Sequence, residues 1–130
     1  MHPIHEEEAG AAMQMILSAL AALRVPLQQG EYDMHRLVMQ ALEAAGLPAA
    51  HEVMLAPRCR IDLMFGGIGI EIKRGRPESA WIRAQLTRYA ACEQVKGLIL
   101  VTERTVALPR SLCGKPVRVV CLNRLWGIAL

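Results

Sequence analysis

The sequence predicts an α/β fold in which helices flank a central mixed sheet. Segments with helical and strand-like spacing follow one another in the order helix, three strands, helix, strand. Residues 98–102, Leu-Ile-Leu-Val-Thr, form a nearly continuous apolar run, as expected of a parallel strand covered on both faces after a helical crossover. A further helix is expected ahead of this core.

The composition is that of one folded domain. The chain has 130 residues, of which 53% are hydrophobic, and this is enough to build one core. We expect residues 1–130 to form a single domain, with an N-terminal helical extension over residues 1–30 and the core over residues 31–122. A net charge of +3 permits a polyanionic partner without requiring one, and the basic residues gather around the middle of the chain.

Cysteine spacing and the apolar segments indicate where the protein works. The four cysteines are widely spaced and form no C-x-x-C pair, so neither a zinc site nor an iron–sulfur cluster is predicted. The apolar run over residues 11–23 is too short to span a bilayer, and the acidic residues before it do not suit a signal peptide. We expect a cytoplasmic protein with reduced thiols and no membrane partner.

Two helices are predicted before the strands. The first covers residues 5–23 and carries an apolar stripe that suits internal packing, with a homodimer interface as the alternative. The second runs from Glu31 to Ala45 and ends at Gly46, which is followed by Pro48. Glu31 begins the buried side of this helix, where it serves either the helix dipole or a functional site.

A β-hairpin over residues 60–75 is the centre of the prediction. A strand at residues 52–55 leads into it, and Gly66-Gly67 suits a tight two-residue turn. The period of two then gives one apolar face made of Ile61, Leu63, Phe65, Ile68, Ile70 and Ile72.

The other face of the hairpin carries charged side chains. The same register sets Asp62 directly opposite Glu71, with Lys73 on the same face. Two carboxylates so placed repel each other unless a divalent cation lies between them, so the pair indicates a metal site. The alternative is an ordinary solvated face on which Lys73 pairs with a carboxylate.

A helix at residues 80–93, with Ser79 as its N-cap, follows the hairpin. Gln85 and Tyr89 lie one turn apart on its inward side, either as functional groups or as a hydrogen-bonded boundary pair. Strands are predicted at residues 98–102 and 117–122.

Taken together, these residues resemble the PD-(D/E)XK nuclease superfamily over residues 31–120. Asp62 followed by Glu71-Ile72-Lys73 on the next strand is similar to its signature. Gln85 and Tyr89 resemble the QxxxY motif of the RecB-type branch, and Glu31 resembles the acidic residue on the first core helix. The chain departs from the pattern in having Arg60-Ile61 rather than a Pro before Asp62, and no separate target-recognition domain is predicted.

The resemblance implies a restriction-endonuclease-like αβββαβ core and a metal-dependent deoxyribonuclease. Asp62, Glu71 and the main-chain carbonyl of Ile72 would hold Mg²⁺, for which Mn²⁺ could substitute, and Glu31 would hold a water of that ion or help a second ion. Lys73 would position or deprotonate the attacking water.

Other residues would support the site and bind the substrate. Gln85 would fix the backbone of the active site or contact a phosphate. Tyr89 would pack behind Gln85 or stack on a base. The expected partner is nucleic acid, with DNA as the substrate, and the candidate phosphate contacts are Arg74, Arg76, Arg83 and Arg88. The alternative function is a non-catalytic nucleic-acid-binding or assembly module with the same fold.

Overall fold

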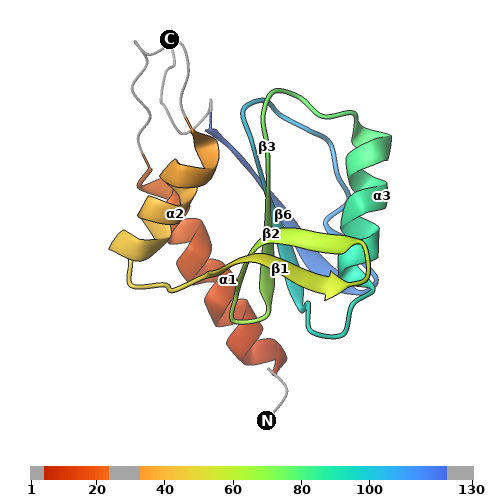
Figure 1. The fold of residues 1–130 in the computed structure, drawn as a ribbon, viewed down its shortest axis with the longest axis horizontal. Helices are drawn as coiled ribbons and strands as arrows, with labels where there is room; N and C mark the ends of the chain where they lie inside the picture. Colours follow the sequence, from red (N-terminus) through yellow and green to blue (C-terminus); the bar gives the residue numbers. More distant parts are fainter. Residues whose placement is uncertain (1–4, 24–32, 123–130) are drawn as a thin grey trace.

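The computed structural model describes residues 5–23 and 33–122, and within these ranges it contains a six-stranded mixed sheet and three helices (Figure 1). The strand order across the sheet is β1-β2-β3-β4-β6-β5. The elements along the chain are α1 (Glu6–Ala21), α2 (Met34–Ala44), β1 (Ala50–Ala56), β2 (Cys59–Phe65), β3 (Ile68–Lys73), α3 (Ser79–Ala90), β4 (Gly97–Thr102), β5 (Ser111–Leu112) and β6 (Lys115–Cys121).

The sheet changes character at β3. The pairs β1–β2 and β2–β3 are antiparallel, whereas β3–β4 and β4–β6 are parallel. The short strand β5, which was not predicted, pairs antiparallel with β6. The predicted α/β class and the predicted order of helix, three strands, helix, strand are confirmed by the run from α2 to β4.

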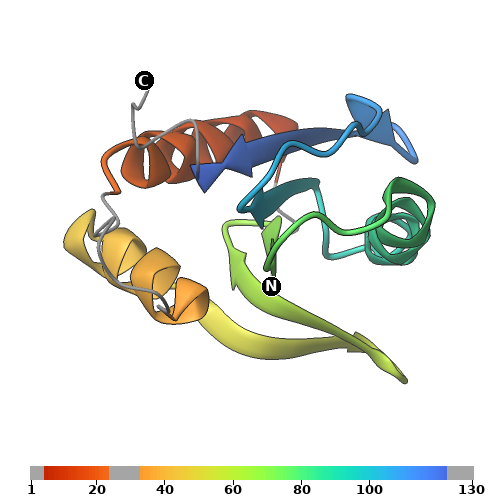
Figure 2. The same ribbon diagram turned by 90° about the horizontal axis from the view of Figure 1, so that it is seen from above.

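Helices cover both faces of the sheet. On one face, α1 and α2 pack on a cluster that includes Ile70, Ile72 and Val101. On the other face, α3 packs on a cluster that includes Leu98 and Leu100 (Figure 2). Every residue of β4 is buried, as predicted for a strand covered on both sides.

The helices differ in detail from the prediction. Asp33 caps α2 by accepting a hydrogen bond from the N–H of Arg36 at 3.1 Å, so the helix begins at Met34 rather than at Glu31, and Glu31 lies outside the described residues. Ser79 is the first residue of α3 and not its N-cap, a position that Glu78 takes without a side-chain hydrogen bond. None of the described helices combines the length and the apolar character needed to cross a membrane.

The hairpin register is confirmed near its turn. Leu63 pairs with Ile70 and Phe65 with Ile68, and both turn glycines have positive φ angles of 56° and 83°. The predicted apolar face is wrong at one position, because Ile61 packs in the α3 cluster instead of beside Ile72. The end of the Ile61 side chain occupies the space that a Cβ on residue 69 would need, so a larger residue there would require Ile61 to move.

A bend in β1 and β2 causes this change of face. Glu52 has a φ of +48°, which is uncommon for a residue with a side chain, and the pairing of β1 with β2 skips Glu52 and Asp62. The two strands curve away from the rest of the sheet (Figure 2). Backbone pairing between β2 and β3 therefore ends at Leu63 and Ile70, just before Asp62 and Glu71.

Candidate active site

Asp62 and Glu71 lie at the point where β2 and β3 separate. The N–H of Ile72 donates a hydrogen bond to Oδ2 of Asp62 at 2.8 Å, and the N–H of Asp62 donates to Oε1 of Glu71 at 3.3 Å. Each carboxylate thus binds the main chain of the opposite strand, where a backbone carbonyl would lie in a continuous ladder. The predicted proximity of the two carboxylates is present, although the residues are not a regular cross-strand pair.

Lys73 completes this group from the end of β3. Its Nζ lies 3.1 Å from Oε2 of Glu71, and the lysine side chain is 24% exposed whereas that of Glu71 is 4% exposed. The ammonium also lies 4.9 Å from the centroid of the Trp81 ring. A buried carboxylate is therefore joined to a cation that reaches the surface, at the carboxyl end of a central strand.

Burial and neighbouring charge act on Glu71 in opposite directions. Burial raises the pKa of its carboxyl above the ordinary value of 4.5, the Asp62 carboxylate raises this pKa further, and the Lys73 ammonium lowers it. The net effect is a raised pKa. The site therefore holds negative charge at an energetic cost that a bound cation would relieve.

This raised pKa predicts a pH-dependent gain in stability for Glu71→Gln in metal-free protein. Because the folded state binds the Glu71 proton more tightly than the unfolded chain, this group lowers the free energy of unfolding as pH rises above about 4.5. Lys73 remains partly solvated after the substitution. We expect Glu71→Gln to raise the free energy of unfolding near pH 7.5, and to raise it by less near pH 4.5.

Urea unfolding in EDTA at the two pH values measures the difference between the variant and the wild type. Glu43→Gln is the matched control, because Glu43 is an exposed acid on α2 at the other face of the sheet. A Glu71→Gln protein that is less stable than the wild type at the higher pH would contradict the expectation.

Helix α3 turns one row of side chains toward these residues. Trp81, Gln85 and Tyr89 are spaced four residues apart, which sets them along one side of the helix. Oε1 of Gln85 is buried and accepts no hydrogen bond from the described residues. The predicted role of Gln85 in fixing the backbone is therefore not seen for this oxygen, which is left to accept a hydrogen bond from another donor.

Tyr89 is an internal support and not a surface residue. It is 2% exposed, and its hydroxyl donates a hydrogen bond to the main-chain carbonyl of Arg60 at 2.9 Å. Burial and the nearby Glu71 carboxylate raise the pKa of Tyr89, so the phenol stays protonated and can donate. Its burial leaves no exposed ring face for stacking on a base, and its hydroxyl holds the main chain just before Asp62.

The four predicted phosphate contacts are all exposed but do not share one surface. Residues of an α-helix are about 100° apart, so Arg88 lies roughly 60° from Gln85 whereas Arg83 lies roughly 160° away, on the other flank of α3. Nε of Arg74 lies 4.0 Å from Glu103, whose carboxylate also accepts a hydrogen bond from the N–H of Gly75. Arg88 is therefore on the flank of α3 nearer to Gln85, and Arg83 is on the opposite flank.

The oxygen donors suit a hard divalent cation. Asp62 and Glu71 supply carboxylate oxygens, to which the Ile72 carbonyl can be added. Within residues 5–23 and 33–122, no group of three or more His, Cys, Asp or Glu side chains is placed to hold a metal, and the four cysteines are free. The ion would therefore keep several waters, as Mg²⁺ does, or take a further ligand such as Glu31 from outside the described residues.

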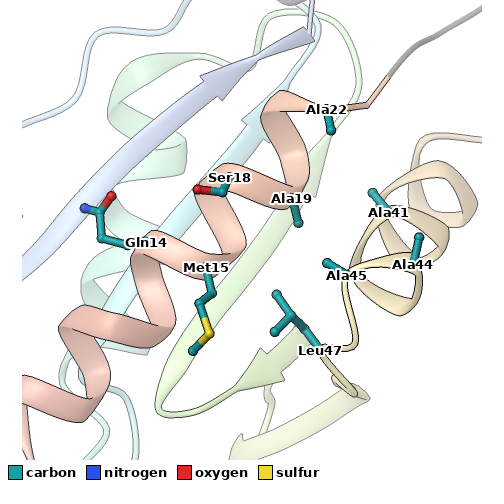
Figure 3. Close-up of a pocket in the computed structure, with 9 residues that line it drawn as sticks. All are labelled: Gln14, Met15, Ser18, Ala19, Ala22, Ala41, Ala44, Ala45 and Leu47. Carbon is teal, nitrogen blue, oxygen red and sulfur yellow. The ribbon is translucent and has the colours of Figure 1, made fainter.

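A hollow on the opposite face of the sheet lacks such chemistry. A groove of about 560 Å³ lies between α1 and α2 (Figure 3). Among the described residues, no acid, base or cysteine lines it. It is lined by Gln14, Met15, Ser18, Ala19, Ala22, Ala41, Ala44, Ala45 and Leu47.

Trp81 is the site residue that the sequence did not reveal. An exposed tryptophan four residues before Gln85, in the first turn of the helix, was the available signal.

Searches of family models, of curated proteins and of solved structures each found no match to this chain. Function is therefore inferred from the residues themselves.

Proposed function

We propose that this protein is a metal-dependent nuclease that hydrolyses phosphodiester bonds in DNA, using Mg²⁺ with Mn²⁺ as a substitute. The observation that carries the proposal is the group formed by Asp62, Glu71 and Lys73. Two carboxylates hold each other's strands where β2 and β3 separate, and a lysine lies 3.1 Å from the more buried one. Metal-assisted hydrolysis needs ligands for the ion, which the carboxylates can supply, and it is helped by a group that acts on the attacking water, which the lysine can supply.

The arrangement of the sheet supports a PD-(D/E)XK type of nuclease with a restriction-endonuclease-like core. The elements from α2 to β4 follow the αβββαβ order, and the sheet is antiparallel up to β3 and parallel beyond it. Asp62 lies on the second strand of this core and Glu71 on the third. The motif and the sheet thus point to the same type of protein from different observations.

Asp62, Glu71 and the main-chain carbonyl of Ile72 would hold the ion. When bound, Mg²⁺ lowers the pKa of a coordinated water and offsets negative charge on the phosphate. The cost of keeping the buried Glu71 ionised beside the half-buried Asp62 supports this role, because the net effect of burial, Asp62 and Lys73 is still a raised pKa of Glu71, which a bound cation would lower. Tyr89 holds the Arg60 carbonyl and so fixes the strand just before Asp62.

Lys73 has two tasks that follow from its position. Its ammonium can donate hydrogen bonds to a phosphate oxygen and can orient the attacking water, while Glu71 keeps the side chain in place. Arg74, Arg76 and Arg88 would bind neighbouring phosphates without reading the base sequence.

Cleavage of a panel of labelled linear, circular, branched and single-stranded DNAs by the wild-type protein tests this function. We expect cleavage with Mg²⁺ or Mn²⁺ and none with EDTA, together with ion binding by isothermal titration calorimetry. A protein that binds DNA but neither cleaves it nor binds either ion would instead be a non-catalytic binding module.

A further inference from the structure

Trp81 is exposed in a place where its ring touches the candidate catalytic lysine. Its side chain lies in the first turn of α3 and is 54% exposed, although tryptophan carries a large apolar surface. Among the described residues, the other large apolar side chains exposed to this degree are Met15 and Met54. Of these three, Trp81 carries an aromatic ring, and its centroid lies 4.9 Å from Nζ of Lys73.

We propose that Trp81 is a stacking platform for an unpaired base of the substrate, so that the protein acts beside an unpaired nucleotide. This inference rests on the proposed nuclease function. The phosphate that undergoes attack must lie near Lys73, and the Trp81 ring is 4.9 Å from the lysine Nζ. A ring so close to the reacting phosphate lies within reach of a base on an adjoining nucleotide.

The pairing state of that base follows from the geometry of nucleic acids. In a duplex, both faces of an internal base are covered by its neighbours, so an aromatic side chain cannot stack on it. A base in a single strand, at a gap or at a splayed end has a free face, and stacking on it contributes to affinity whatever its identity. The exposed Arg74 and Arg76 lie just before the helix and suit the phosphates of the same strand.

Holding Lys73 in place does not by itself account for the exposure of Trp81. A tryptophan that served only as packing for the lysine would be better stabilised if its ring were buried. The other aromatic residue of this row, Tyr89, is buried and its hydroxyl is already bonded, so it cannot stack on a base. Trp81 therefore provides the aromatic surface of the site.

Tryptophan fluorescence tests the proposal without any need for cleavage. The chain has two tryptophans, so Trp126→Phe leaves Trp81 as the single tryptophan, which can be excited selectively over the two tyrosines. In EDTA, we expect an oligothymidine to quench this fluorescence and a hairpin duplex of equal charge to quench it much less. Trp81→Ala in the otherwise native protein should weaken binding of the labelled oligothymidine about tenfold, while Trp81→Phe should retain most of the affinity.

Met15→Ala is the matched control, because Met15 is 47% exposed on α1, at the other face of the sheet, and should leave binding unchanged. Unchanged oligothymidine affinity in Trp81→Ala would overturn the stacking proposal alone, provided that the wild type cleaves DNA with Mg²⁺. Equal quenching by the duplex would also overturn it. A wild-type protein that binds neither oligonucleotide in EDTA and cleaves no DNA with Mg²⁺ would contradict the nuclease function as well.

Discussion

Asp62→Asn and Glu71→Gln are each expected to slow metal-dependent cleavage by at least about a thousandfold, which corresponds to roughly 4 kcal/mol of lost transition-state stabilisation. Both substitutions keep the shape of the side chain and replace one carboxylate oxygen with an NH₂ group, which removes the negative charge. The hydrogen bonds that join β2 to β3 use oxygens that the amides retain, so the local structure should persist. Activity is then lost because the ion is no longer held.

Thermal unfolding separates this cause from misfolding. Mg²⁺ that binds the folded wild type should stabilise it by about 2.7 kcal/mol at a hundredfold excess over Kd, and this gain should vanish in both variants. Glu43→Gln, which removes an exposed acid from α2, should keep the cleavage rate and the Mg²⁺-induced stabilisation. Full activity in either variant would show that the substituted residue does not hold the catalytic ion.

The order of the core elements and the register near the turn could be predicted because local patterns determine them. Gly66-Gly67 selects the turn, and the period of two then sets Leu63 opposite Ile70. The continuous apolar run of β4 identifies a strand buried on both faces without any knowledge of its neighbours.

The change of face at Ile61 could not be predicted, because its cause is a backbone conformation and not a pattern. Glu52 adopts a positive φ, which a glutamate rarely does, and no residue type near it signals this. The bend separates β2 from β3, and the two carboxylates then replace the missing ladder bonds. Sequence spacing thus predicted which acids would meet, but not how they are held.

The surface roles on α3 were predicted less well for a related reason. The stripe of Gln85 and Tyr89 could be read from their spacing, but burial of Tyr89 depends on how closely the helix packs against Arg60. The surroundings of Trp81 likewise depend on where β3 ends, because Lys73, the last residue of that strand, lies against the Trp81 ring. These features result from tertiary packing, which helix propensity does not encode.

Lys73→Met should slow cleavage by about 10²–10⁴-fold while leaving Mg²⁺ binding in place, as expected for loss of a group that acts on the attacking water. The methionine keeps the length and apolar stem of the lysine but removes the ammonium that lies 3.1 Å from Glu71. Single-turnover cleavage measures the chemical step, and calorimetry measures the ion. Lys96→Met is the control, because Lys96 lies beside the Gly66-Gly67 turn at the other end of β3. Equal rates in Lys73→Met and wild type would reduce Lys73 to a charge partner of Glu71.

Lys73→Arg then distinguishes two ways in which the lysine can act. A guanidinium keeps the positive charge and can orient a phosphate or a water, but it does not release a proton in proteins. Recovery to within about tenfold of the wild-type rate would assign Lys73 to charge and orientation. A rate as low as that of Lys73→Met would mean that the amine itself is needed, either for its compact shape beside Glu71 or to transfer a proton.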